Sequence, residues 1–461
     1  MDANVIGEGT YGCIHKPSLH CDGDVIDNYN NKVSKILSTK HAEKELSEYS
    51  TISTIDKSHQ YYLGKPTECQ PDDSEYNRSA IQKCSNAKDL IADLGNVSLI
   101  VMEDGGINLE TFADNAHKWK NTPENRRRME LFWIEFHRVL KGIQLFLKKN
   151  VLHLDMKPQN IVYDETKNRV NIIDFGLTHN INTILSRSKE SVNGLAGHHW
   201  SYPFEFMFHN KDVFDKMSGA SDAQKEKYCL KVIKNVDNRE KDKTSRAFLN
   251  FFSFVIEDSD NYDQLFTKYM KGVYENIVYE IIPENYNDVL VASLRTTDIY
   301  GTGIAIAYVA NKTKHLMGKE FTQDMGDLVY AMTDPVVFRR YDIVRVIKTF
   351  EGILEKYNAL SHNNVRFEKH KVVRRDIPVK ITQHIKSVSA KNIVLSKDER
   401  SSDPIRIKTE KPCPPGHLRD PKTRRCRKVC PKGTVRDPKT RRCITQKNIA
   451  STVSVKAWAQ S

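Results

Sequence analysis

The spacing of apolar residues along the chain separates predicted helices from predicted strands. Between residues 124 and 149 apolar side chains recur at helical spacing with charges between them, which predicts a long amphipathic helix with a core-facing stripe. Residues 40 to 55 predict a second helix. Residues 32 to 37 alternate in polarity like a short strand, and the apolar run from Val97 to Met102, which ends at a glycine turn, predicts a buried strand. The apolar positions of the long helix are Leu131, Ile134, Val139, Ile143, Leu145 and Phe146.

An acid, a base and an amide lie within the eight residues from His153 to Asn160, and Asp174-Phe175-Gly176 follows fourteen positions later. This spacing suits one kind of chemistry. Asp155 would orient an attacking hydroxyl or accept its proton, while Asn160 and Asp174 would hold Mg²⁺ on a nucleotide. Lys157 would neutralise charge on a transferring phosphoryl group. For His153 we expect a structural role next to the Asp-Phe-Gly turn.

Glycines near the N-terminus form the pattern G-x-G-x-x-G, which lets backbone N–H groups approach phosphates because no Cβ intervenes. A dinucleotide-binding loop has the same pattern but opens a helix. Here the glycines lead into Pro17 and a polar loop, which favours a β-hairpin that covers a nucleotide. The predicted nucleotide-binding residues are Ile6, Gly7, Glu8, Gly9, Thr10, Tyr11, Gly12, Cys13 and Ile14.

The order of these motifs resembles the protein kinase signature, in which the glycine-rich loop precedes H-x-D-x-K-P-x-N and D-F-G. The resemblance covers about residues 1–355 apart from an insertion. It implies a bilobal α+β fold, with an N-lobe over 1–105 and a C-lobe over 106–355. It also implies transfer of the γ-phosphate of ATP, with Mg²⁺, to protein hydroxyls. The form D-x-K-P-x-N resembles that of serine/threonine kinases.

The resemblance assigns a role to Lys35 in the strand Lys32–Leu37, as the residue that contacts the α- and β-phosphates. The following helix should supply a glutamate that pairs with Lys35. Glu45 and Glu48 lie three apart on one helix face. We favour Glu45, because apolar positions follow it at helical spacing.

Two further features concern regulation of the activity and the ion pair that would anchor the segment after D-F-G. Leu154 stands where the family usually has an arginine that reaches a phosphorylated loop, and an apolar residue cannot make that ion pair. This implies constitutive activity or another means of control, and Ser186, Ser188 and Ser191 are not proposed as switches. Tyr202-Pro203-Phe204-Glu205 resembles A-P-E, whose glutamate would pair with Arg339 or Arg340.

The next family pattern, D-x-Y-x-x-G, begins at Asp298, so residues from about 207 to 292 resemble an insertion. A structureless loop of this length is improbable. We predict a helical subdomain, which is either part of a substrate-docking surface or a passive elaboration. Its aromatic residues to bury are Phe248, Phe251, Phe252, Phe254, Tyr269, Tyr274 and Tyr279.

Length and composition bound the remaining possibilities. The 461 residues exceed a single core. We expect no membrane span, since no run of eighteen apolar residues exists, and no signal peptide, since the first residues lack an apolar stretch. The scattered cysteines Cys13, Cys21, Cys69, Cys84 and Cys229 are expected to be reduced thiols of an intracellular protein.

The basic charge of the chain belongs to its C-terminal part. Residues 361–461 carry 26 Lys and Arg against 8 Asp and Glu, whereas residues 1–360 carry 45 against 51. The basic segment could therefore bind nucleic acid or acidic proteins by charge. We divide it into a basic linker over 356–410, which could equally be a solvated disordered tail, a repeat region over 411–445 and a tail over 446–461.

The repeat region contains two similar units, Cys413–Cys426 and Cys430–Cys443, which share 11 of 14 residues at a shift of 17. Each unit has almost nothing apolar to bury and needs a cross-link. A disulfide within each unit is favoured over one Zn²⁺ held by four thiolates, because C-x-x-C pairs are missing. The repeats lack aromatic residues for stacking on bases, which argues against specific readout of single strands.

The repeats beside a divergent kinase resemble proteins of large cytoplasmic DNA viruses, such as iridoviruses and mimivirus relatives. That resemblance implies a location in the host cytoplasm or in the virion. The sequence thus favours a Ser/Thr protein kinase. One alternative is a pseudokinase or scaffold whose basic tail binds nucleic acid or virion components. The other is a small-molecule phosphotransferase, against which Lys157 and the segment around Glu205 argue.

Overall fold

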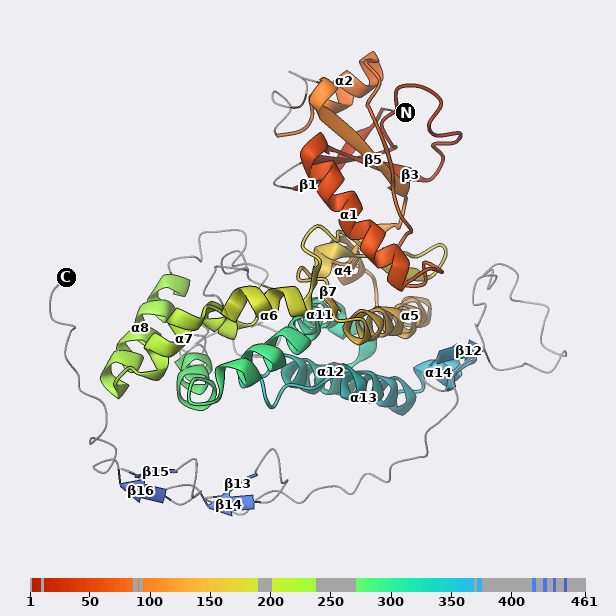
Figure 1. Ribbon diagram of the computed structural model, residues 1–461. Coiled ribbons are helices and arrows are strands. Elements are labelled where there is room, and N and C mark those ends of the chain that lie inside the picture. Colours follow the sequence, from red (N-terminus) through yellow and green to blue (C-terminus); the bar gives the residue numbers. More distant parts are fainter. Residues whose placement is uncertain are drawn as a thin grey trace. The chain divides into compact units, whose positions relative to one another are not determined.

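The computed structural model describes residues 2–9, 12–85, 90, 94–189, 201–237, 271–368 and 371–374, together with four short strands near the C-terminus (Figure 1). Clustering of contacts divides the chain into two units, residues 1–389 and 390–461, which are described separately below. The first unit contains both the sheet and the helices that the sequence predicted.

The N-terminal residues form a five-stranded antiparallel sheet in the order β1-β2-β3-β5-β4. The predicted strands at 32–37 and 97–102 are confirmed as β3 and β5, which pair along the whole of β3. Neighbouring residues in a strand face opposite sides. Ile36 accordingly packs with Ile81 of helix α2, whereas Leu37 packs with Ala42 of helix α1. The elements are β1 Asn4–Gly9, β2 Gly12–Lys16, β3 Lys32–Ser38, α1 Thr39–Ile55, β4 Thr67–Cys69, α2 Glu75–Ile81, η1 Leu94–Asn96 and β5 Val97–Glu103.

The predicted long helix is confirmed as α5, Pro123–Lys148. It begins with Pro123 in its first turn, and the side chain of Thr122 accepts a hydrogen bond from the Asn125 N–H, as an N-cap should. Four of the six predicted apolar positions are buried, while Leu131 and Leu145 are half-buried. The short elements around α5 are β6 Ile107–Asn108, α4 Leu109–His117, β7 Val151–Leu152, η2 Pro158–Asn160, β8 Ile161–Asp164, β9 Arg169–Ile172, β10 His179–Asn180 and α6 Ile181–Lys189.

Helix α11, Tyr286–Met317, is buried on nearly all sides along its middle turns. A helix that is apolar or satisfied all round belongs inside a core rather than at a surface. It packs with α4, α5 and α12, and its buried residues share one large core with those of α5 and α13. The helices that follow it are α12 Lys319–Met332 and α13 Ile343–Lys356.

The expected insertion over 207–292 is helical where the structure describes it. It contains η3 Phe204–Phe208 at its start, α7 Lys211–Ser218, α8 Asp222–Asp237, the π-helical turn η5 Ile277–Ile281 and the first turns of α11. Tyr274 is buried as expected, but Tyr279 is exposed, so the prediction was wrong for Tyr279. The predicted aromatic residues from Phe248 to Tyr269 lie outside the described residues.

The packed part of the first unit continues beyond residue 355, where the sequence suggested a basic linker. Helix α14, Ala359–His362, and strand β11, Val365–Glu368, bury Leu360 and Val365 in the main core. Asn363 donates to Glu130 of α5 at 3.0 Å. β11 pairs with β12, Lys371–Arg374. The boundary expected at 355 is therefore too early, because the apolar residues just after it complete the core around α5.

In the second unit the described residues form two hairpins, one in each repeat. Arg419 lies opposite Cys426, and Arg436 lies opposite Cys443, so the registers are equal at a shift of 17. Cys413 and Cys430 lie outside the described residues, and the cross-link of the repeats stays a prediction. The strands are β13 His417–Arg419, β14 Cys426–Lys428, β15 Thr434–Arg436 and β16 Cys443–Thr445.

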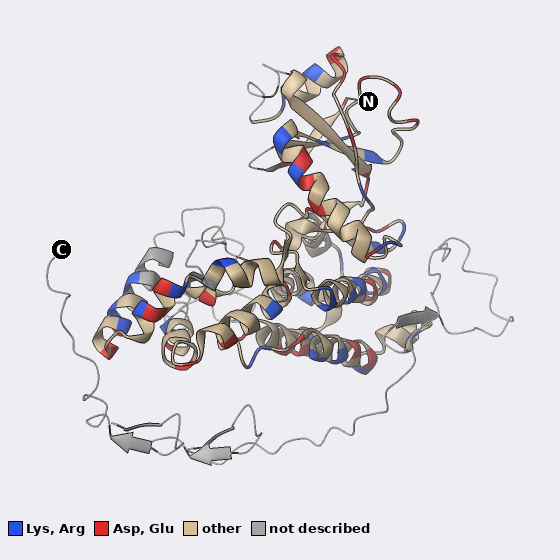
Figure 2. Ribbon diagram, viewed as in Figure 1, with Lys and Arg blue, Asp and Glu red and all other residues tan. Residues whose placement is uncertain are grey.

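Charged residues of both signs occur along helices α1, α5 and α13 (Figure 2). Across the described part of the chain, no helix combines the length and the apolar character that crossing a membrane requires.

Candidate active site

Lys35 and Glu45 form a nearly buried ion pair between β3 and α1, with Nζ and Oε2 2.6 Å apart. Glu45, and not the alternative Glu48, is the glutamate of α1 that is buried against the sheet and pairs with Lys35. Burial alone would disfavour the charge on Lys35, but Asp174 and Glu45 outweigh it and raise the pKa of the lysine. Lys35 therefore stays a cation whose field reaches Asp174.

Asp174 is half-buried beside three cationic or polar groups. Burial acts to raise the pKa of its carboxyl, but Lys35, His153 and Lys157 together lower it below the ordinary value. Its φ of 61° is in the left-handed region, and its Oδ1 accepts the Gly176 N–H at 3.4 Å. Asp174 is therefore held as an ionised carboxylate that also accepts a hydrogen bond from the backbone of Gly176.

The predicted catalytic residues come together in the loop between β7 and β8. The Lys157 ammonium donates to both carboxylate oxygens of Asp155, at 2.9 and 2.8 Å. Asn160 donates its amide to the Asp155 carbonyl at 2.8 Å and to Asp155 Oδ2 at 2.6 Å. With its amide nitrogen fixed on Asp155, Asn160 keeps its side-chain oxygen for another partner.

His153 has the structural role that the sequence predicted. Its ring donates from Nε2 to the Ile173 carbonyl at 2.9 Å and accepts the Asp155 N–H on Nδ1 at 3.2 Å. The ring also lies 5.1 Å from that of Phe175, which is fully buried. His153 therefore joins the catalytic loop to the turn that carries Asp174.

Helix α11 fixes the backbone of the catalytic loop. The buried Asp298 carboxylate accepts the N–H groups of His153 and Leu154 at 2.8 and 2.9 Å. Leu154 has φ 62°, a left-handed conformation that costs energy in a branched residue and needs such support. A Cβ on Gly301 would lie 2.2 Å from the Met156 carbonyl, so only glycine permits this contact. The sequence used Asp298 only as a landmark and missed its role.

The glycine-rich segment forms the hairpin β1–β2, with Glu8 opposite Cys13 and Gly9 opposite Gly12. Thr10 and Tyr11, at its tip, lie outside the described residues. A Cβ on Gly12 would lie 2.0 Å from the Ile36 carbonyl, so this glycine is required by packing on β3. A Cβ on Gly7 would meet only the side chain of Ile14, at 3.5 Å, which is an ordinary contact distance. Ile6 is exposed, so it can contact a ligand.

Four cysteines that we expected to be reduced thiols form two disulfides in this part of the structure. Cys13 bonds Cys84, and Cys21 bonds Cys69, across sequence separations of 71 and 48 residues. The expectation was wrong because the sheet and α2 bring residues that are scattered in sequence to Cα separations of 6.1 and 5.6 Å. The Cys13 side chain is fully buried, so only its backbone can face a nucleotide.

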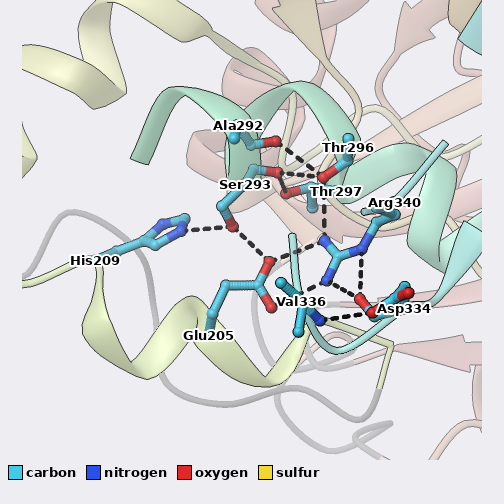
Figure 3. Close-up of polar contacts among 9 residues, drawn as sticks. All are labelled: Glu205, His209, Ala292, Ser293, Thr296, Thr297, Asp334, Val336 and Arg340. Carbon is cyan, nitrogen blue, oxygen red and sulfur yellow. Dashed lines mark hydrogen bonds and ion pairs between the residues drawn. The ribbon is translucent and has the colours of Figure 1, made fainter. Parts of the chain in front are cut away.

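The Glu205 carboxylate forms a fully buried ion pair with Arg340, with Oε1 and Nη1 2.8 Å apart (Figure 3). Arg340, not Arg339, is thus the partner, and Arg339 pairs with Glu280 at the surface. Burial opposes ionisation of Glu205, but Arg340 outweighs it and holds the pKa of the carboxyl below its usual range. Ser293 also donates to Glu205, a contact that the sequence did not suggest.

These residues fit a magnesium nucleotide. The ionised carboxylate of Asp174 and the side-chain oxygen of Asn160 are the hard oxygen ligands that Mg²⁺ prefers. Lys35 supplies a fixed positive charge for phosphate, which Glu45 orients.

Comparisons with known proteins agree with this geometry. Residues 109–198 match the family model described as protein kinase domain. "Mitogen-activated protein kinase kinase kinase 8" of Rattus norvegicus is 44% identical over 52 residues, which cover 11% of this chain. The chain spans only about a tenth of the length of that relative. Residues 109–198, which match the family model, include Asp155, Asn160 and Asp174, so the comparisons support a protein kinase.

Proposed function

We propose that this protein transfers the γ-phosphoryl group of ATP to serine or threonine hydroxyls of protein substrates. The observation that carries the proposal is the meeting of Asp155, Lys157 and Asn160 in one hydrogen-bonded loop. The ion pair between Lys35 and the buried Glu45 and the ionised carboxylate of Asp174 support it.

Each residue then has a defined task. Asp155 accepts the proton of the attacking hydroxyl or orients it. Lys157, which already contacts Asp155, lies where it can stabilise negative charge that develops on the transferred group. Asn160 and Asp174 hold the metal, and Lys35 orients phosphate. Bound Mg²⁺ would neutralise phosphate charge during transfer.

The preference for serine or threonine rests on Lys157 in the D-x-K-P-x-N form. The segment from Asp174 to Glu205 supports a protein substrate over a small molecule, since it ends in the buried Glu205–Arg340 pair. The viral origin and the location in host cytoplasm or virion remain proposals that rest on the cysteine repeats.

The first experiment incubates the full chain with Mg·ATP and a panel of serine, threonine and tyrosine peptides. Asp155→Asn should reduce phosphoryl transfer by about 10³-fold or more, the scale expected for loss of a catalytic group with its orientation. Asp164→Asn is a matched control, because Asp164 ends β8 and its carboxylate forms an ion pair with the exposed Lys167. Transfer that persists in Asp155→Asn would show that the assigned role is wrong, and transfer to tyrosine alone would refute the predicted specificity.

The alternative, a scaffold that acts through its basic tail, has a different signature. Residues 390–461 carry 19 Lys and Arg against 6 Asp and Glu, and their removal leaves the first unit whole. We expect the shortened chain to keep phosphoryl transfer and to lose binding to heparin at moderate salt. Heparin binding that survives the truncation would refute the charge argument. A full chain that binds heparin but neither binds nor uses Mg·ATP would favour the scaffold.

A further inference from the structure

The residues that follow helix α2 contact both strands of the glycine-rich hairpin, in a way that the proposed chemistry does not use. We call the segment Lys83–Ser85 the strap. Its Lys83 ammonium donates to the Ala3 carbonyl at 2.9 Å and to Asn4 Oδ1 at 3.2 Å. Asn4 is the first residue of β1, and Ala3 directly precedes it. The strap is therefore attached to the start of the hairpin.

The strap also holds one residue pair near the other end of the hairpin, through both strands. Glu8 of β1 lies opposite Cys13 of β2. The Ser85 N–H donates to Glu8 Oε1 at 2.8 Å, and Cys84 forms its disulfide with Cys13. One carboxylate oxygen of Glu8 and the two sulfurs lie within 4.8 Å of one another. Two consecutive residues of the strap thus fix the two strands at the same level.

The disulfide to the strap lies on the face of the sheet that is opposite to that of Lys35. Residues opposite each other in an antiparallel pair point to the same face, and neighbours along a strand point to opposite faces. Ile14 lies opposite Lys35, whereas Cys13 lies opposite Ile36, which packs in the core with α2. The bond from Cys13 to the strap therefore does not occupy the face on which Lys35 would meet phosphate.

The fixed pair of residues is next to the pair of Gly9 and Gly12, with which the described ladder of the hairpin ends. A hairpin that is held by backbone pairing alone loses freedom when its N–H groups close on a phosphate, and this loss weakens binding. A covalent bond and a hydrogen bond on its back restrict that freedom before a ligand arrives. Preorganisation of this kind tightens binding without adding a contact to the ligand.

We infer that Cys84 is a positioning residue that, through its bond to Cys13, holds the glycine-rich hairpin in the conformation that receives the phosphates of a nucleotide. This inference deepens the proposed function and rests on it for the nature of the ligand. It makes nucleotide affinity depend on a disulfide that lies on the far side of the sheet. A dithiol reductant passes two electrons and two protons to the two cysteines and itself becomes a cyclic disulfide, which frees the hairpin from the strap.

The test measures the dissociation constant of Mg·ADP by calorimetry on the full chain, together with the KM values for ATP and for the best peptide. Cys84→Ser should raise the dissociation constant and the ATP KM about five- to tenfold, because preorganisation is lost. The kcat and the peptide KM should stay within about twofold of wild type. Cys13→Ser and the double variant should show the same rise and no larger one, because a single bond is lost in all three.

Cys69→Ser is the matched control. It opens the second disulfide of the same sheet, between Cys69 of β4 and Cys21, and neither residue belongs to the hairpin. The dissociation constant of Mg·ADP should therefore stay within about twofold of wild type. A dithiol added to Cys69→Ser should then produce the full rise, whereas Cys84→Ser should not respond further. Mass analysis of peptides establishes which bonds are open in each sample.

An unchanged or lower dissociation constant in Cys84→Ser would overturn the inference. An equal rise in Cys69→Ser would also overturn it, since general loosening of the sheet would then explain both effects. Binding of Mg·ADP needs no phosphoryl transfer, so the two proposals can fail separately. A wild type that transfers no phosphate but binds Mg·ADP in this disulfide-dependent way would refute the kinase activity and support the positioning role. A wild type that binds no Mg·ADP would refute both.

Discussion

The sheet that carries Lys35 and the helices that carry Asp155 are stabilised by different means. The sheet packs a small core between β-strands and α2, and two disulfides cross it. The helical part has a large continuous core around α5 and α11 and buries a fully desolvated ion pair, Glu205–Arg340. A small core gains from cross-links that restrict the unfolded chain. A large core can enclose charge if every polar atom finds a partner.

The two parts also position their residues of the site by different interactions. In the sheet, Lys35 is positioned by β-ladder pairing and by one glutamate from α1. In the helical part, the catalytic loop and the segment after it are both attached to α11 by buried hydrogen bonds. The oxidation state of the cysteines should therefore change the stability of the sheet. Loss of a single buried polar group should change the stability of the helical part.

The largest expected effect is the removal of one partner of the buried ion pair. Arg340→Leu leaves the Glu205 carboxylate without its cation and should reduce the free energy of unfolding by about 3–5 kcal/mol. Arg339→Leu is a matched control at the next residue, where the partner Glu280 is exposed, and should cost at most about 1 kcal/mol. Urea denaturation measures both. Equal losses in the two variants would show that the buried pair is not a distinct source of stability.

A smaller effect, confined to the sheet, is expected from breaking a disulfide. Cys84→Ser and Cys69→Ser should each reduce stability by about 2–4 kcal/mol, because each opens a long closed loop. Hydrogen exchange should rise in β1–β5 and stay unchanged in α5 and α11. A dithiol reductant should produce the same pattern in wild type.

The control for this experiment is Cys229→Ala, which removes the free thiol of α8. It should leave the exchange of the sheet unaffected by itself and should not alter the response to reductant. Mass analysis of unreduced peptides that finds Cys13 and Cys84 unlinked would contradict the cross-linked sheet directly.

Sequence reasoning grouped residues that the structure also brings together where these residues are close in the chain or follow a period. Asp155, Lys157 and Asn160 lie within six residues, and the register of α1 favoured Glu45 over Glu48. It failed for long-range pairing. Nothing local distinguishes Arg340 from Arg339 as the partner of Glu205, and the disulfides join residues 71 and 48 apart.

Sequence reasoning also missed residues whose roles depend on their burial in the folded protein. Asp298 reads as one polar residue of a helix until α11 is known to be buried all round, because only then must its carboxylate find donors in the neighbouring loop. His209 and Ser293 were missed for the same reason. Both are buried, and burial of residues at the borders of a long insertion cannot be inferred from local spacing.

The last prediction concerns acid stability and applies to the helical part. The folded state holds His209 neutral, with a pKa of about 4 against an ordinary value of 6.5. The unfolded chain therefore binds more protons in this range, and stability present above about pH 6.5 is lost as the pH falls toward 4. The shift corresponds to at most about 3 kcal/mol. His209→Gln cannot titrate, so its urea midpoint should fall less between pH 7 and 4 than that of wild type.

The stability that the Glu205 carboxylate contributes is also lost as the pH falls, but at lower pH than that of His209. The reason is that the pKa of Glu205 in the folded state lies below its usual range. The difference between wild type and His209→Gln should therefore open between pH 6.5 and 4, before the carboxylate contributes. Parallel pH profiles of the two proteins would mean that His209 is not held neutral by burial.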